Sequence, residues 1–112
     1  MYEYEAIVTS VYDADTIRVD IDLGFFTWIH NQSIRLKGID APEIRGAERP
    51  QGLVAKDALL TMIQPGDQIV LRTYKDSLKG KYGRWVADVF TNDGVHVNEW
   101  LVANDYATKV DY

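Results

Sequence analysis

Three short segments of the 112-residue sequence carry polar residues that a small fold does not need for packing. The first, IRLKGIDAPEIRG at positions 34–46, places Arg35, Asp40 and Glu43 close together around a glycine and a proline. The other two are DADT at positions 13–16 and KYGR at positions 81–84. Carboxylates bind hard cations and guanidinium groups bind phosphoryl oxygens, so this combination is suited to phosphate chemistry.

The carboxylates indicate an oxygen-ligand metal site. Asp15 and Asp40 lie on different segments and can together bind Ca²⁺, completed by a backbone carbonyl and waters. Zinc is a poor match, because His30 and His96 stand alone and the sequence contains no cysteine.

The residues around Asp40 add further candidate roles. Glu43, three residues beyond Asp40, is a candidate to orient or deprotonate a metal-bound water. Pro42 favours an extended conformation at Ala41, which gives the Ala41 carbonyl a definite direction. Phosphodiester cleavage builds negative charge on the phosphoryl oxygens, and we expect Arg35 and Arg84 to stabilise that charge.

Each of these features also has an ordinary structural reading. DADT reads as a turn with a side-chain hydrogen bond, KYGR as a solvated hairpin loop, and Arg35 as a surface charge on a strand. Their joint occurrence favours a functional site.

Composition limits the classes of function. The apolar fraction is 46% and the charged fraction 26%, as expected of one soluble domain spanning residues 1–112. No apolar run approaches the length of a membrane span, and the N-terminal stretch lacks the pattern of a signal peptide, so we expect a cytoplasmic protein with no membrane partner. The net charge of −5 argues against passive, tight binding to a polyanion.

Periodicity predicts a mainly β fold with helices. The segment TIRVDIDL alternates apolar and polar residues, which is typical of a strand with one buried face. We expect strands over 5–13, 16–23, 28–37, 68–74 and 85–91, a helix over 50–63, and a short helix over 98–103. Five strands with a helix between the third and fourth, and a short C-terminal helix, match the OB-fold, a five-stranded Greek-key barrel. Another small α+β sheet is the alternative.

Two apolar segments carry more specific expectations. In the helix, Leu53, Val54, Ala58 and Met62 recur at helical spacing and predict its apolar face. In GFFTWIHN, Phe25, Phe26 and Trp28 fall in or beside a hairpin connection; we expect them to pack against the barrel, with a partner or homodimer contact as the alternative.

The quoted motifs resemble the staphylococcal nuclease-like (thermonuclease) domain family. DADTIRV, IRLKGIDAPE, KYGRWVADV and DGVHVNEWLV occur in the family's order, from about position 6 to position 107. The resemblance implies an OB-fold nuclease that uses Ca²⁺ to cleave DNA and RNA, leaving 3′-phosphate and 5′-hydroxyl ends. Ala14 stands where the family usually has Gly, and Ala41 where well-known members have Thr. A carbonyl ligand needs no side chain, so metal binding is compatible with Ala41.

The resemblance also implies a role for each matching residue. Asp15 and Asp40 would be carboxylate ligands, the Ala41 carbonyl a further ligand, and Glu43 the residue that holds the attacking water. Arg35 and Arg84 would bind the scissile phosphate. Lys81 and Tyr82 would line the nucleotide site.

Two functions from other classes remain as alternatives. One is a catalytically silent OB-fold module that binds nucleic acid or a protein. We expect such a module to lack a catalytic carboxylate or arginine, whereas this chain keeps the whole set. The other is an interaction domain whose acidic surface binds a basic partner, with Phe25, Phe26 and Trp28 as anchors.

Overall fold

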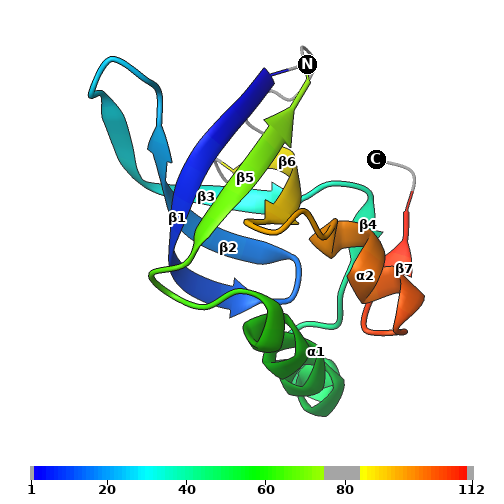
Figure 1. Ribbon diagram of the computed structural model, residues 1–112. Coiled ribbons are helices and arrows are strands. Elements are labelled where there is room, and N and C mark those ends of the chain that lie inside the picture. Colours follow the sequence, from blue (N-terminus) through cyan, green and yellow to red (C-terminus); the bar gives the residue numbers. More distant parts are fainter. Residues whose placement is uncertain (1, 75–83, 111–112) are drawn as a thin grey trace.

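The computed structural model describes residues 2–74 and 84–110, and five long strands of this part close into a barrel (Figure 1). They are β1 (Tyr2–Asp13), β2 (Thr16–Asp22), β3 (Trp28–Leu36), β5 (Gln68–Thr73) and β6 (Trp85–Thr91). Their order is β1-β2-β3-β6-β5, and β5 pairs back with β1. Only the β3–β6 pair among them is parallel. This is the OB-fold, so the predicted fold class is confirmed, although β1 begins three residues earlier than expected.

The barrel closes because each strand presents alternate apolar residues to the interior. On β2 the side chains of Ile17 and Val19 are buried, and Arg18 between them is exposed. On β3 the buried residues Ile34 and Leu36 flank Arg35. The same alternation that fills the core therefore presents arginines on the outward face of β2 and β3.

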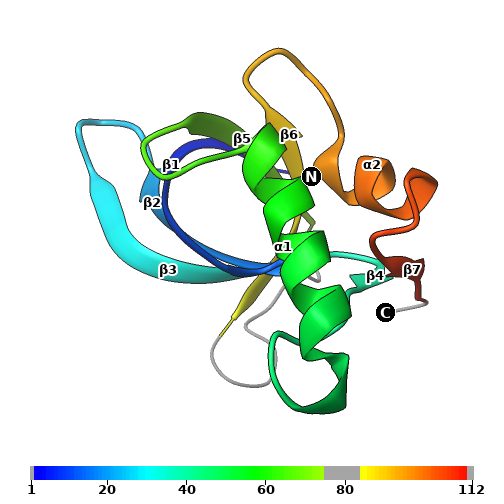
Figure 2. The ribbon, with the colours of Figure 1, turned by 90° about the horizontal axis from the view of Figure 1, so that it is seen from below.

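Helix α1 (Arg49–Met62) covers one end of the barrel and follows a short 3₁₀ turn, Gly46–Glu48 (Figure 2). Its buried residues are Gly52, Ala55, Ala58 and Leu59. The predicted apolar face was therefore partly wrong, because Leu53 and Val54 are exposed. The helix packs through its smaller residues, which allow it to lie close to the barrel.

A second helix and a small sheet cover the neighbouring side. Helix α2 (Val97–Ala103) begins one residue before the predicted boundary, and β4 (Ile39–Asp40) pairs with β7 (Thr108–Lys109). Asn98 ties α2 to the barrel: it accepts a hydrogen bond from the Val89 N–H and donates to the carbonyls of Lys37 and Ala87. The chain beyond α2 is thereby held beside Asp40.

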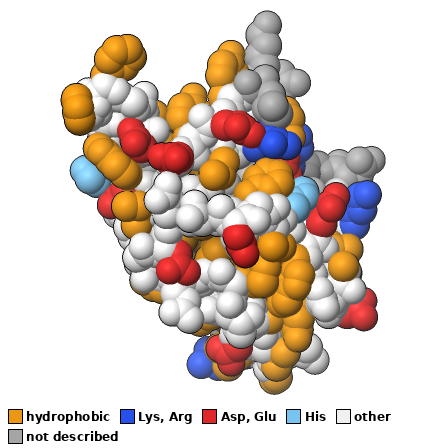
Figure 3. All heavy atoms as spheres, in the orientation of Figure 1, with side chains coloured by type: hydrophobic (Ala, Val, Ile, Leu, Met, Phe, Trp, Pro, Cys, Tyr) orange, Lys and Arg blue, Asp and Glu red, His pale blue; other side chains and the backbone are white. Residues whose placement is uncertain are grey.

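The β2–β3 hairpin projects from the barrel (Figure 1), and hydrophobic side chains stand out at its tip (Figure 3). Phe25 and Phe26 are 99% and 103% exposed, and both have positive φ, at 54° and 59°. The expectation that they pack against the barrel was wrong. The tight turn between two long strands points both rings away from the core, and Trp28 is also exposed.

Within residues 2–74 and 84–110, no helix is both long enough and apolar enough to span a bilayer.

Candidate functional site

A cleft of about 860 Å³ lies over the outward side of β2 and β3 and reaches the segment after β4. Its described lining is strongly charged, with both signs equally represented. The carboxylates are Asp13, Asp15, Asp40 and Glu43, and the guanidinium groups are Arg18, Arg35, Arg45 and Arg84. The formal charges of the described carboxylates and guanidinium groups in this cleft therefore cancel, although the net charge of the whole chain is −5.

Asp15 lies in the turn between β1 and β2 and is only 6% exposed. Its Oδ1 accepts a hydrogen bond from the Thr16 hydroxyl at 3.0 Å, and its Oδ2 accepts one from the Ala41 N–H at 2.9 Å. Its backbone carbonyl accepts the Leu36 N–H at 2.8 Å. The bonds from Thr16 and Ala41 therefore orient the buried carboxylate, and the bond from Leu36 fixes the backbone that carries it.

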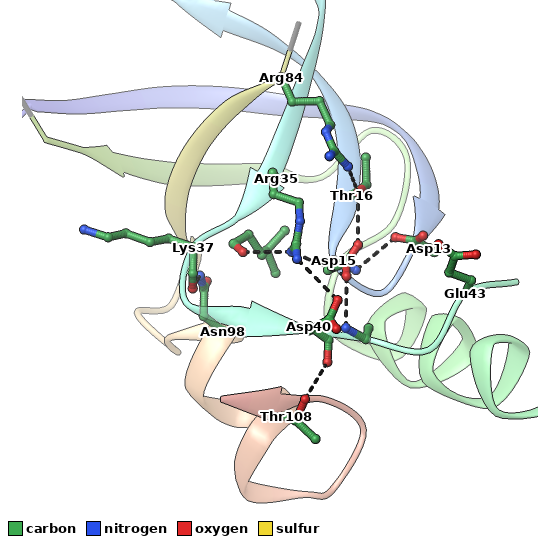
Figure 4. Close-up of polar contacts among 12 residues, drawn as sticks. Asp13, Asp15, Thr16, Arg35, Lys37, Asp40, Glu43, Arg84, Asn98 and Thr108 are labelled. Atoms are coloured by element: carbon green, nitrogen blue, oxygen red, sulfur yellow. Dashed lines mark hydrogen bonds and ion pairs between the residues drawn. The ribbon is translucent and has the colours of Figure 1, made fainter. Parts of the chain in front are cut away.

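Arg35 projects from β3 toward two carboxylates (Figure 4). Its Nη1 lies 3.4 Å from Asp15 Oδ2, and its Nη2 lies 3.5 Å from Asp40 Oδ1. Nη1 also donates to the Leu36 carbonyl at 3.1 Å. With its side chain only 13% exposed, Arg35 is a largely buried cation that joins the two predicted metal ligands.

Asp40 is placed by the small sheet rather than by the barrel. The chain turns at Gly38, whose φ of 75° is readily adopted only by glycine, and Asp40 then pairs with Thr108. The Asp40 carbonyl accepts the Thr108 hydroxyl at 3.3 Å. The Asp40 carboxylate itself is 56% exposed and faces Arg35, so it is open to the cleft.

Glu43 lies on an exposed segment whose backbone is held from several sides. Its N–H donates to Glu48 Oε2 at 3.3 Å, and Arg49 donates to the Ile44 carbonyl at 2.9 Å. Helix α1 approaches at Gly52, where a Cβ atom would collide with the Glu43 carbonyl oxygen. The helix therefore supports this backbone directly.

Arg84 precedes β6 and points toward Thr16, next to Asp15 (Figure 4). Its Nη1 donates to Thr16 Oγ1 at 3.3 Å, and the same hydroxyl donates to Asp15. Arg84 and Arg35 therefore both approach Asp15. Lys81 and Tyr82, predicted to line the nucleotide site, lie outside the described residues.

Asp13 is a cleft residue that the sequence analysis did not single out. It is 7% exposed, and its Oδ1 accepts the Asp15 N–H at 3.1 Å. Burial raises the pKa of Asp13 to about 7, and the neighbouring side chain and negative charge of Asp15 act in the same direction, whereas the hydrogen bond from the Asp15 N–H opposes the shift. The first Asp of DADT could have indicated this cleft residue. An Asp at that position is also common in turns, where its side chain accepts a backbone N–H two residues further on.

The chemistry of the donors fits a hard cation such as Ca²⁺. Asp15 and Asp40 supply carboxylate oxygens that converge on one guanidinium, and Ala41 is adjacent to Asp40 in the chain. In the described part of the chain, however, no group of three or more His, Cys, Asp or Glu side chains is arranged to hold a metal ion. An ion here would therefore depend on two carboxylates, backbone oxygen and water, which Ca²⁺ accepts.

The fold and the cleft define an OB-fold protein with a charged site on the β2–β3 face, the face through which such barrels bind oligonucleotides and oligosaccharides. More specifically, the chain belongs to the staphylococcal nuclease homologue family, which matches residues 33–112.

The chain is also similar to parts of two named proteins. The chain is 36% identical to "Endonuclease YhcR" of Bacillus subtilis (strain 168) over 113 residues, covering 94% of this chain and 9% of that protein. It is 44% identical to "Probable staphylococcal-like nuclease CAN1" of Oryza sativa subsp. japonica over 69 residues, covering 62% of this chain and 18% of that protein. The chain thus spans less than a fifth of either relative.

Proposed function

We propose that this chain is a calcium-dependent nuclease that hydrolyses phosphodiester bonds of DNA, RNA or both, leaving 3′-phosphate and 5′-hydroxyl ends. One observation carries the proposal: Asp15, Arg35, Asp40, Glu43 and Arg84, which come from three segments of the chain, all line one cleft. Family membership and the names of both relatives support the same class of reaction.

In the proposed reaction a water oxygen attacks phosphorus, the bond from phosphorus to the 5′ oxygen breaks, and the departing 5′ oxygen takes a proton from solvent to become the 5′-hydroxyl. Glu43, whose backbone is held against α1, orients the water and accepts its proton. Arg35 and Arg84 stabilise the charge that develops on the phosphoryl oxygens.

Asp15, Asp40 and the Ala41 carbonyl would hold the calcium ion. When bound, the ion supplies positive charge that polarises a phosphoryl oxygen. Asp15 is already fixed by Thr16 and by the Ala41 N–H, so this ligand needs little rearrangement.

The direct test is incubation of the chain with end-labelled single-stranded DNA and RNA, either with millimolar Ca²⁺ or with a chelator. We expect calcium-dependent cleavage, with products that carry 3′-phosphate and 5′-hydroxyl ends. Cleavage that persists in chelator would overturn the metal assignment. Binding without cleavage would favour the catalytically silent OB-fold module.

Arg84→Ala tests the arginine assignment with little risk to folding, because Arg84 lies at the start of a strand rather than in the core. Loss of a donor to a developing charge typically lowers kcat by ~10² to 10³. Arg72→Ala is the matched control, since Arg72 lies on β5 and pairs with Glu3 at 2.8 Å. Comparable cleavage by Arg84→Ala and wild type would remove Arg84 from the mechanism.

We also propose that two copies of the chain associate through the projecting hairpin. The support is the nearly complete exposure of Phe25 and Phe26, two adjacent aromatic rings of the kind that anchor interfaces. Sedimentation equilibrium of wild type and of the Phe25→Ser/Phe26→Ser variant tests this. A monomeric wild type at high micromolar concentration would contradict it.

A further inference from the structure

We infer that the cleft contains a second nucleotide subsite, in which Arg18 binds the phosphate next to the scissile one and Tyr12 stacks on the base attached to it. This inference rests on the proposed function and extends it from a single phosphodiester to a strand. Both residues line the cleft, and neither has a role in the metal and phosphate chemistry described above.

Tyr12 lies on the outward side of β1, beside an irregularity in the pairing of that strand. Val11 pairs with Ile17 and Asp13 pairs with Thr16, with a register shift between the two pairs at Tyr12. Val11 and Asp13 are buried at 9% and 7% exposure, whereas Tyr12 is 47% exposed. Tyr12 therefore offers an aromatic ring at the cleft, next to the buried carboxylate of Asp13.

Arg18 continues the row of outward residues that begins at Thr16. Two residues along a strand are about 7 Å apart and point to the same side. Thr16 pairs with Arg35, and Arg18 pairs with Ser33 on the neighbouring strand. Arg18 therefore lies one step along the cleft floor from the Arg35 position, and we assign it to the next phosphate along the strand.

The charge of Arg18 is not consumed by a carboxylate in the described part of the chain. Its Nη1 donates to the Asn31 carbonyl at 3.3 Å and to the Asn31 side-chain oxygen at 3.4 Å, which are long hydrogen bonds to a neutral residue. Arg35, by contrast, faces both Asp15 and Asp40. The two arginines thus differ. Arg35 is paired with two carboxylates, whereas the positive charge of Arg18 is available to an anionic ligand.

The combination of Arg18 and Tyr12 is suited to single-stranded nucleic acid. A guanidinium takes a phosphate and an aromatic ring takes a base, and stacking of this kind tolerates any base. A base inside a duplex shows no free face to Tyr12, whereas an unpaired base does. The subsite therefore predicts that cleavage becomes more efficient when the substrate has a second phosphate and a third nucleotide.

The test compares two substrates: the dinucleotide TpT, which holds one phosphate, and octathymidylate. Stacking contributes about 1–3 kcal/mol per base, so Tyr12→Ala should lower kcat/KM on octathymidylate at least about fivefold. Arg18→Ala should do the same and reduce the salt dependence of octathymidylate binding, since one phosphate contact is lost. Cleavage of TpT should change less than twofold in both variants.

The matched controls are Tyr2→Ala and Arg72→Ala. Tyr2 is 54% exposed near the start of β1 and Arg72 pairs with Glu3, and neither lines the cleft. Both controls should behave like wild type on both substrates. Equal losses on TpT and octathymidylate, or no loss on either, would overturn the subsite.

Failure of the proposed function is separable from failure of this inference. If wild type cleaves neither substrate, the nuclease proposal fails, and the subsite is then tested by fluorescence anisotropy of labelled octathymidylate. Binding that weakens at least fivefold in Tyr12→Ala and Arg18→Ala, but not in the controls, supports the subsite. Unchanged binding in these two variants overturns it.

Discussion

Nη1 of Arg35 lies 3.4 Å from Oδ2 of Asp15, so a residue expected to contact phosphate and a residue expected to bind metal form an ion pair with each other. The second nitrogen of the same guanidinium faces Asp40 at 3.5 Å. An ion bound by the two carboxylates would offset their negative charge and leave Arg35 available for a phosphate. Metal and phosphate should therefore bind cooperatively.

The first prediction is this coupling. A 3′-phosphorylated mononucleotide should bind more tightly with Ca²⁺ than with a chelator, and the nucleotide should raise Ca²⁺ affinity by the same factor. Couplings of this kind are typically about 5- to 150-fold. Isothermal titration calorimetry in both orders measures both factors. Equal nucleotide affinity with and without Ca²⁺ would show that Arg35 is not restrained by its carboxylates.

The second prediction concerns the metal ligands. If Ca²⁺ binds the folded chain, saturation at about 100 times its Kd should raise the free energy of unfolding by about 2.7 kcal/mol, seen as a higher Tm. Asp40→Asn should abolish this shift while the chain still folds, because the Asp40 carboxylate is half exposed. Asp57→Asn, on the exposed face of α1, should keep the shift. An unchanged shift in Asp40→Asn would remove Asp40 from the site.

The barrel and much of the cleft could be predicted because they follow from strong local patterns. Alternation on β2 and β3 places Ile17 and Ile34 inside and Arg35 outside. The β4–β7 pairing that holds Asp40 could not be predicted, because strands of two residues show no periodicity.

Two other features depended on tertiary packing. The face of α1 was misassigned because Ala55 and Leu59 compete with Leu53 and Val54 as an apolar stripe, and only the close approach to the barrel decides between them. The exposure of Phe25 was only the alternative expectation, because apolar rings in a hairpin normally suggest packing against the barrel.

The third prediction follows from Asp13. Its pKa is raised to about 7 in the folded chain by burial and by Asp15, against 3.8 for the ordinary carboxyl. Between these values the folded state binds more protons than the unfolded state, so stability falls as the pH rises through about 7. The loss between pH 5 and pH 8 should be on the order of 2 kcal/mol.

Urea unfolding in chelator at several pH values measures this effect. Asp13→Asn keeps an oxygen that can accept the Asp15 N–H, but its side chain cannot titrate. The free energy of unfolding of this variant should therefore lack the pH dependence that Asp13 contributes. The informative quantity is the difference between wild type and variant, because other carboxylates titrate in the same range. A difference that does not change between pH 5 and pH 8 would contradict the raised pKa.

The fourth prediction concerns Gly52, which lies inside α1 where a Cβ would collide with the Glu43 carbonyl oxygen. Replacing glycine by alanine in a helix interior normally stabilises by about 1 kcal/mol. Gly52→Ala should instead destabilise by about 1–3 kcal/mol, the usual cost of overpacking, and should lower kcat by displacing the Glu43 backbone. Val54→Ala, an exposed change on the same helix, should leave kcat unchanged.

A double-mutant cycle distinguishes displacement of Glu43 from general loosening of the fold. If Gly52 acts through Glu43, then adding Gly52→Ala to a Glu43→Ala background should lower kcat little further, because the group it displaces is already gone. General loosening of the fold would instead make the effects independent. The increases in activation free energy caused by the two substitutions would then add. Helix packing therefore supports Glu43 specifically only if the two changes are strongly non-additive in kcat, whatever they do to the free energy of unfolding.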